Sequence, residues 1–141
     1  MDDLVQWLRA QLDEDERTAR AAGGAAWEEL PVSGWVHTSP LPSSEWQPPG
    51  YDHHVASAPL AEDRAHIVAH DPARVLREID AKRLIMECHE PWTEVRGDTI
   101  CGRCGREHID GRPGGHFPCQ TMRLLALPYA DRPGYRDEWR P

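Results

Sequence analysis

The chain has 141 residues, of which 39% are apolar, and its formal net charge is −8. This length suits a single domain, residues 1–141, with a modest core. The acidic balance argues against a domain that binds nucleic acid over its whole surface. The chain has no apolar run of about 18 residues, and its N-terminus is acidic where a secretory signal would be basic. We therefore expect a cytoplasmic protein without a membrane span, in which clustered cysteines bind metal rather than form disulfides.

The first predicted element is a helix over residues 3–22, within an N-terminal segment 1–24. Leu4, Leu8 and Leu12 recur every four residues, which predicts one apolar side turned toward the core. Gly23 and Gly24 then end the helix.

Residues 25–58 differ in character, because prolines and glycines interrupt short apolar stretches. They predict a small antiparallel sheet with a proline-rich loop, its strands near residues 26–30, 34–38 and 53–57. His53 and His54 are neighbours in this range. Adjacent side chains on a strand point to opposite faces, so we do not predict a metal site at this pair.

Residues 59–88 predict two helices separated at His70. Asp71 suits the cap of the second helix, and Pro72 suits its first position, where a missing N–H costs nothing. One side of that helix is apolar and is formed by Val75, Leu76, Ile79 and Met86.

His66 and His70 lie four residues apart on the first of these helices, close to Asp63. Some zinc enzymes present ligands at this spacing, so a metal-dependent hydrolase that uses the two histidines is one alternative. Between them stand Ile67, Val68 and Ala69, without the glutamate that would act as general base. We therefore favour ordinary surface or capping histidines.

All four cysteines lie between residues 88 and 119. Cys101 and Cys104 are two residues apart, which lets both thiolates bind one ion, and Gly105 allows a turn with positive φ. Cys119 stands at the head of a further predicted helix. Three thiolates and one imidazole would complete a closed tetrahedral Zn²⁺ site in the segment 89–128, with no position left for water. We therefore predict structural rather than catalytic zinc and no catalytic residues.

His89 is the preferred fourth ligand, because it would tie the end of the long helix to the two cysteines. Cys88 is adjacent and chemically competent, but the helix would aim one of the two inward. His116 and His108 are further alternatives within the loop before Cys119. Residues 89–118 are short of large apolar side chains, so bound metal would supply much of their order.

The tail, residues 129–141, carries aromatic side chains at Tyr129, Tyr135 and Trp139 among prolines and charges. We expect this irregular segment to pack back over the domain. A tail that binds a partner is the alternative.

Three stretches together resemble a family of small uncharacterised zinc-knuckle proteins from actinobacteria and their phages. They are AHIVAHDPARVLREIDAKR at 65–83, the series His89, Cys101, Cys104 and Cys119, and MRLLALPYADRPGYRDEW at 122–139. The helix exit ARAAGGAAWE at 19–28 is similar as well, whereas residues 30–58 are distinct. Cys88 is not part of the pattern. The resemblance implies His89 as the ligand and a mobile-element or actinobacterial origin, and it supplies no activity.

The predicted fold class is α+β: an N-terminal helix, a small antiparallel sheet, two central helices, and a zinc-knuckle segment that leads into a C-terminal helix. The predicted function is a non-catalytic, zinc-stabilised module that binds a protein partner or regulates one, with self-association left open. A nucleic-acid-binding regulator is the second hypothesis. It would use the arginines around the knuckle, Arg103, Arg106, Arg112 and Arg123.

Overall fold

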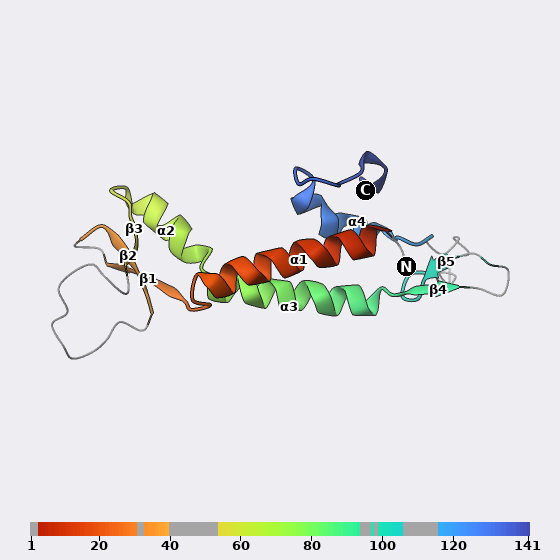
Figure 1. The fold of residues 1–141 in the computed structure, drawn as a ribbon, viewed down its shortest axis with the longest axis horizontal. Coiled ribbons are helices and arrows are strands. Elements are labelled where there is room, and N and C mark those ends of the chain that lie inside the picture. The colour runs from red at the N-terminus through yellow and green to blue at the C-terminus, as the bar shows by residue number, and fades with distance from the viewer. Residues whose placement is uncertain (1–2, 31–32, 40–53, 94–96, 98, 106–115) are drawn as a thin grey trace. The chain divides into compact units, whose positions relative to one another are not determined.

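The computed structural model describes residues 3–30, 33–39, 54–93, 97, 99–105 and 116–141, and it confirms the α+β class (Figure 1). The helices are α1 (Asp3–Ala21), α2 (Ala61–Ala69), α3 (Pro72–Cys88) and α4 (Gln120–Ala126), with 3-10 turns η1 (Leu127–Tyr129) and η2 (Asp137–Trp139). The strands are β1 (Trp27–Leu30), β2 (Trp35–Thr38), β3 (His54–Ser57), β4 (Pro91–Thr93) and β5 (Thr99–Cys101). Among these helices, none combines the length and apolar character that crossing a bilayer requires.

The chain divides into two compact units, which are described separately. Unit 1 comprises Met1–Glu14 and Ile79–Pro141, and unit 2 comprises Asp15–Glu78. The boundaries fall inside α1 and α3, so each of these helices contributes one part to each unit.

Unit 2 is built on a three-stranded antiparallel sheet in the order β1-β2-β3. Trp27 faces Thr38 and Leu30 faces Trp35 in the first pair of strands, and the second pair carries an irregularity after Val36. Val36 is fully buried. The three predicted strands are therefore present, while most of the proline-rich loop, and His53, lie outside the described residues.

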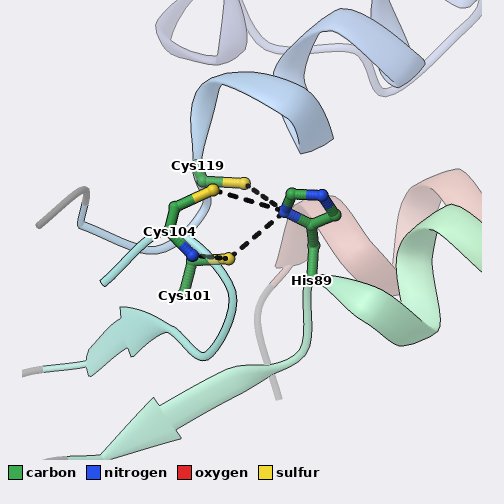
Figure 2. A group of neighbouring side chains, drawn as sticks. All are labelled: His89, Cys101, Cys104 and Cys119. Carbon is green, nitrogen blue, oxygen red and sulfur yellow. Dashed lines mark hydrogen bonds between the residues drawn. The ribbon is translucent and has the colours of Figure 1, made fainter. Parts of the chain in front are cut away.

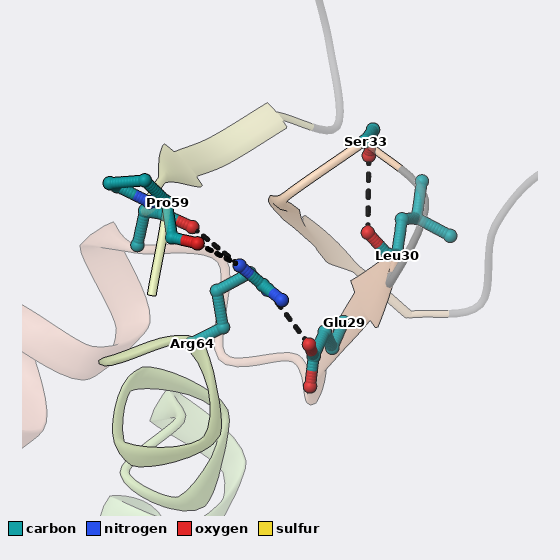
Figure 3. Close-up of polar contacts among 6 residues, drawn as sticks. Glu29, Leu30, Ser33, Pro59 and Arg64 are labelled. Atoms are coloured by element: carbon teal, nitrogen blue, oxygen red, sulfur yellow. Dashed lines mark hydrogen bonds and ion pairs between the residues drawn. The ribbon is translucent and has the colours of Figure 1, made fainter. Parts of the chain in front are cut away.

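Arg64 of α2 is a buried charged residue of unit 2, and only 7% of the residue is exposed. Its Nη1 donates to the backbone oxygens of Ala58 at 2.7 Å and Pro59 at 3.0 Å, and its Nε donates to Glu29 at 2.7 Å. Figure 3 shows the guanidinium between the carboxylate of β1 and these carbonyls. A single buried cation thus connects α2, β1 and the segment after β3.

The corner between α2 and α3 is held by Asp71, which is buried. Its Oδ1 accepts the backbone N–H of Arg74 at 2.6 Å, and Pro72 is the first residue of α3. This confirms the predicted cap. Its Oδ2 also accepts the backbone N–H of Trp27 at 3.3 Å, so the same carboxylate joins the helix start to β1.

Unit 1 has an apolar core drawn from three helices and the tail. Its fully or almost fully buried side chains include Leu4, Leu8 and Leu12 of α1, Ile79 and Met86 of α3, and Met122 and Ala126 of α4. The tail packs against α1 and so back over the domain, as predicted. Trp7 of α1 donates from Nε1 to the backbone oxygen of Pro133 at 3.0 Å. The Trp7 ring also lies 5.5 Å from the rings of Tyr135 and Trp139, measured between centroids.

Replacing Arg64 with Met should destabilise unit 2, because Glu29 and the carbonyls of Ala58, which is buried, and Pro59 lose their donor. We expect a loss of about 2–4 kcal/mol in the free energy of unfolding. Urea denaturation of the metal-loaded protein measures it. Arg20→Met removes a mainly exposed pair with Glu16 and is the control, with an expected loss below about 0.5 kcal/mol. Equal losses for the two variants would contradict the anchoring role.

Candidate metal centre

Four potential ligands from three segments of unit 1 meet at one point (Figure 2). His89 follows α3 directly, Cys101 ends β5, Cys104 lies in the turn after it, and Cys119 caps the start of α4. One ligand atom from each residue lies within 4.8 Å of the others. Cys101 and Cys119 are buried, and the other two are half-buried.

The imidazole nitrogen stands nearly equidistant from the three sulfurs. His89 Nδ1 is 3.4 Å from Sγ of Cys101, 3.4 Å from Sγ of Cys104 and 3.5 Å from Sγ of Cys119. One ring nitrogen has one proton or one lone pair, so it cannot hydrogen-bond well to three thiols together. In a tetrahedral zinc site with Zn–S of about 2.3 Å and Zn–N of about 2.0 Å, a sulfur and a nitrogen lie about 3.5 Å apart. The residues therefore fit one shared cation.

The hairpin of β4 and β5 shapes this site. Its register pairs Pro91 with Cys101, and the N–H of Gly102 donates to the oxygen of Glu90 at 2.8 Å. The chain just after His89 therefore lies beside Cys101. In the following turn the N–H of Cys104 points at Sγ of Cys101, at 3.4 Å, as expected of a knuckle that stabilises a thiolate.

Gly105 is needed for a different reason from the one predicted. It is not among the described glycines with positive φ. Its N–H donates to the oxygen of Cys101 at 2.6 Å, and a Cβ at this position would lie 2.6 Å from that same oxygen and 2.6 Å from Cδ1 of Ile100. The predicted positive φ is therefore wrong, and close backbone approach is the reason for glycine.

In the metal-free chain, the surroundings of Cys104 favour its protonated thiol over the thiolate. Burial, the hydrogen bond with Cys101, and the nearby thiols of Cys119 and Cys101 raise the pKa of Cys104 to about 12. A divalent cation reverses this preference, because its charge stabilises thiolates. Metal binding should therefore release protons and weaken as the pH falls.

The alternative ligands lie elsewhere. Cys88 is exposed at the end of α3, and His116 is exposed in a bridge opposite Ile100. Neither belongs to the described group of four. His108 lies outside the described residues. The N–H of Phe117 donates to the oxygen of Thr99 at 3.1 Å, which places the chain beside β5 shortly before Cys119.

The exposed rings of His66, on α2, and His70, directly after α2, lie 4.3 Å apart and are tilted by 39°. His70 Nδ1 donates to the backbone oxygen of His66 at 2.8 Å, which is a helix-end contact. Within the described ranges, no third His, Cys, Asp or Glu, including Asp63, joins this pair in a metal-binding group.

The arginines named in the nucleic-acid-binding hypothesis differ in their surroundings. Arg103 is exposed, whereas Arg123 donates to the backbone oxygens of Pro118 and Arg140. Arg106 and Arg112 lie outside the described residues.

Sequence comparison places the chain in a family without an assigned role. The family of unknown function DUF6221 matches residues 1–141, including residues 30–58, which the resemblance set apart. No curated protein and no solved structure matches. The family description names neither an activity nor a metal. By the extent of this match, the chain belongs to the family of unknown function DUF6221.

Proposed function

We propose that this protein is a non-catalytic, zinc-stabilised module that binds a protein partner in the cytoplasm. The proposal that the site binds a metal ion rests on the position of His89 Nδ1, which lies 3.4–3.5 Å from all three cysteine sulfurs. Thiolates favour Zn²⁺ over Mg²⁺ or Ca²⁺, and three sulfurs with one imidazole form a familiar structural set. Four protein ligands leave no open position for water or substrate, which supports a structural role.

The weak packing of β4, the strand that follows His89, supports the same role. Strands β4 and β5 have three residues each, and all three residues of β4 are exposed. Trp92 at the centre of β4 is 64% exposed. Such a hairpin buries little apolar surface of its own, so metal ligation would supply most of the free energy that orders it.

The partner-binding part rests on an apolar surface beside the site. Leu84, Ile85 and Cys88 share the exposed side of α3, away from the buried Met86, and Leu84 is 61% exposed. We call these three residues the α3 apolar face. An exposed apolar face on a helix is typical of protein interaction surfaces.

The charges beside this face specify the partner further. Asp80 and Glu87 are exposed on α3 and, at helical spacing, lie along one border of the face. A partner helix with an apolar ridge and basic residues along one border would complement it.

Zinc content should be one ion per chain, and it should depend on His89 and not on Cys88. We expect His89→Ala to weaken Zn²⁺ binding by more than about 100-fold. Losing a direct ligand lowers metal affinity more than losing a residue that only hydrogen-bonds to a ligand. Competition with a chromophoric chelator measures this, and the visible spectrum of the cobalt(II)-substituted protein reports the donor set. Cys88→Ser is the matched control and should bind normally. Weaker binding by Cys88→Ser alone would refute the ligand assignment.

Removal of the metal should loosen the site and leave unit 2 folded. We expect amide exchange at Cys101–Gly105 and Gln120–Ala126 to accelerate by about 100-fold or more, because these segments depend on the ion. Exchange in β1 and β2 should stay the same. Hydrogen exchange with and without a chelator measures both. Unchanged protection around Cys101 would exclude a structural role.

Leu84→Asp should abolish partner binding without changing metal content. Leu60, in unit 2, is 59% exposed and offers a matched control in Leu60→Asp. Quantitative affinity capture from host cells should show a protein retained by the wild type and Leu60→Asp but lost by Leu84→Asp. Sedimentation of the purified protein tests whether the partner is a second copy. A captured protein that Leu84→Asp still binds would argue against the α3 apolar face.

A further inference from the structure

A cavity of about 230 Å³ lies within unit 1, between α1 and α3. It is lined by Arg9 and Asp13 of α1 and by Arg83, Met86 and Glu87 of α3. None of these residues belongs to the described group of four metal ligands. Pockets for drug-sized molecules usually have volumes of about 300–1,000 Å³, so this cavity suits a smaller molecule.

The charged groups that line the cavity differ in whether they are already paired. Arg83 Nη2 donates to Oδ1 of Asp13 at 2.7 Å, which joins the two helices. Arg9 lies one turn from Asp13 on α1, and Glu87 lies one turn from Arg83 on α3. Within the described residues, however, no ion pair joins Arg9 and Glu87 to each other or to a third group. One cation on the α1 side of the cavity and one carboxylate on the α3 side are therefore available to a ligand.

Both available groups can be reached from solvent, because Arg9 and Glu87 are exposed. Met86 is the apolar residue of the lining and is only 5% exposed. Its flexible, polarisable thioether adapts to small apolar groups of different shape. The charged lining residues are two arginines and two acids, so a ligand of zero net charge that carries both signs preserves the balance.

We propose that this cavity binds the zwitterion of a small α-amino acid with an apolar side chain. The ligand carboxylate pairs with the guanidinium of Arg9, whose planar N–H donors match a carboxylate in two parallel hydrogen bonds. The ligand ammonium group donates to the carboxylate of Glu87. The ligand side chain packs against Met86 and against the aliphatic stems of the lining arginines. A polar side chain gains less, because Asp13 and Arg83 are already paired with each other.

L-Leucine is the probe, and two analogues each lack one of its charged groups. Removing the carboxylate gives 3-methylbutylamine, and removing the ammonium group gives 4-methylpentanoate. The chain has three methionines, so ¹³C-methyl spectra of the full-length, metal-loaded protein are simple, and Met86→Leu assigns the signal of Met86. That signal should shift saturably with leucine, at an affinity at least about tenfold higher than for either analogue. An unchanged signal from the buried Met122 of α4 excludes a general effect of leucine on unit 1.

Variants test which residue binds which charged group. In Glu87→Gln the ammonium group has no partner, so leucine and 4-methylpentanoate should bind within about twofold of each other. In Arg9→Gln the carboxylate has no partner, so leucine and 3-methylbutylamine should become equal in the same way. Asp80→Asn changes an exposed acid of α3 that does not line the cavity, and it should keep the full preference for leucine.

Three results would overturn the proposal. The first is the absence of a saturable Met86 shift up to the solubility limit of leucine. The second is equal binding of leucine and either analogue by the wild type. The third is a preference for leucine that persists unchanged in Arg9→Gln and Glu87→Gln, because leucine would then bind elsewhere.

Discussion

Three thiols and one imidazole, on residues up to 30 positions apart, meet within 4.8 Å in unit 1. This convergence determines where the end of α3, the hairpin of β4 and β5, and the start of α4 must lie. The core formed by Leu4, Leu8 and Leu12 organises the helices, whereas all three residues of β4 are exposed. Ligation of one cation, which we propose for this site, would help to order the hairpin of β4 and β5, because two such short strands are only marginally stable alone. The closed site that we propose would leave function to the surfaces that it holds in place.

Among its described residues, unit 2 is organised by polar groups rather than by a large apolar core. Arg64 and Asp71 are buried, and each binds partners on more than one element. Buried charges are stabilising only when their hydrogen-bonding capacity is used, and these two meet that condition. The indole N–H of Trp27 does not, within the described residues.

The sequence was most informative where a local rule governs structure. The four-residue recurrence of Leu4, Leu8 and Leu12 identified the buried side of α1, and Asp71 with Pro72 identified the start of α3. The short apolar stretches between prolines identified β1, β2 and β3. The spacing of Cys101 and Cys104 identified a pair of donors that do lie together. Each of these signals acts over a few residues, so composition and spacing suffice to detect it.

The amino-acid sequence by itself thus determined the approximate helix boundaries, the strands β1 to β3 and the residue types that could bind a cation, but it did not predict β4 and β5. Only the tertiary structure decided that His89, rather than the adjacent Cys88, lies with the three cysteines, because the direction in which α3 ends depends on packing. Neither the ion pair between Arg64 and Glu29 nor the close contacts at Gly105 could be predicted from the sequence. Contacts between distant residues leave no periodic trace in the chain, since they arise only when separate elements are brought together.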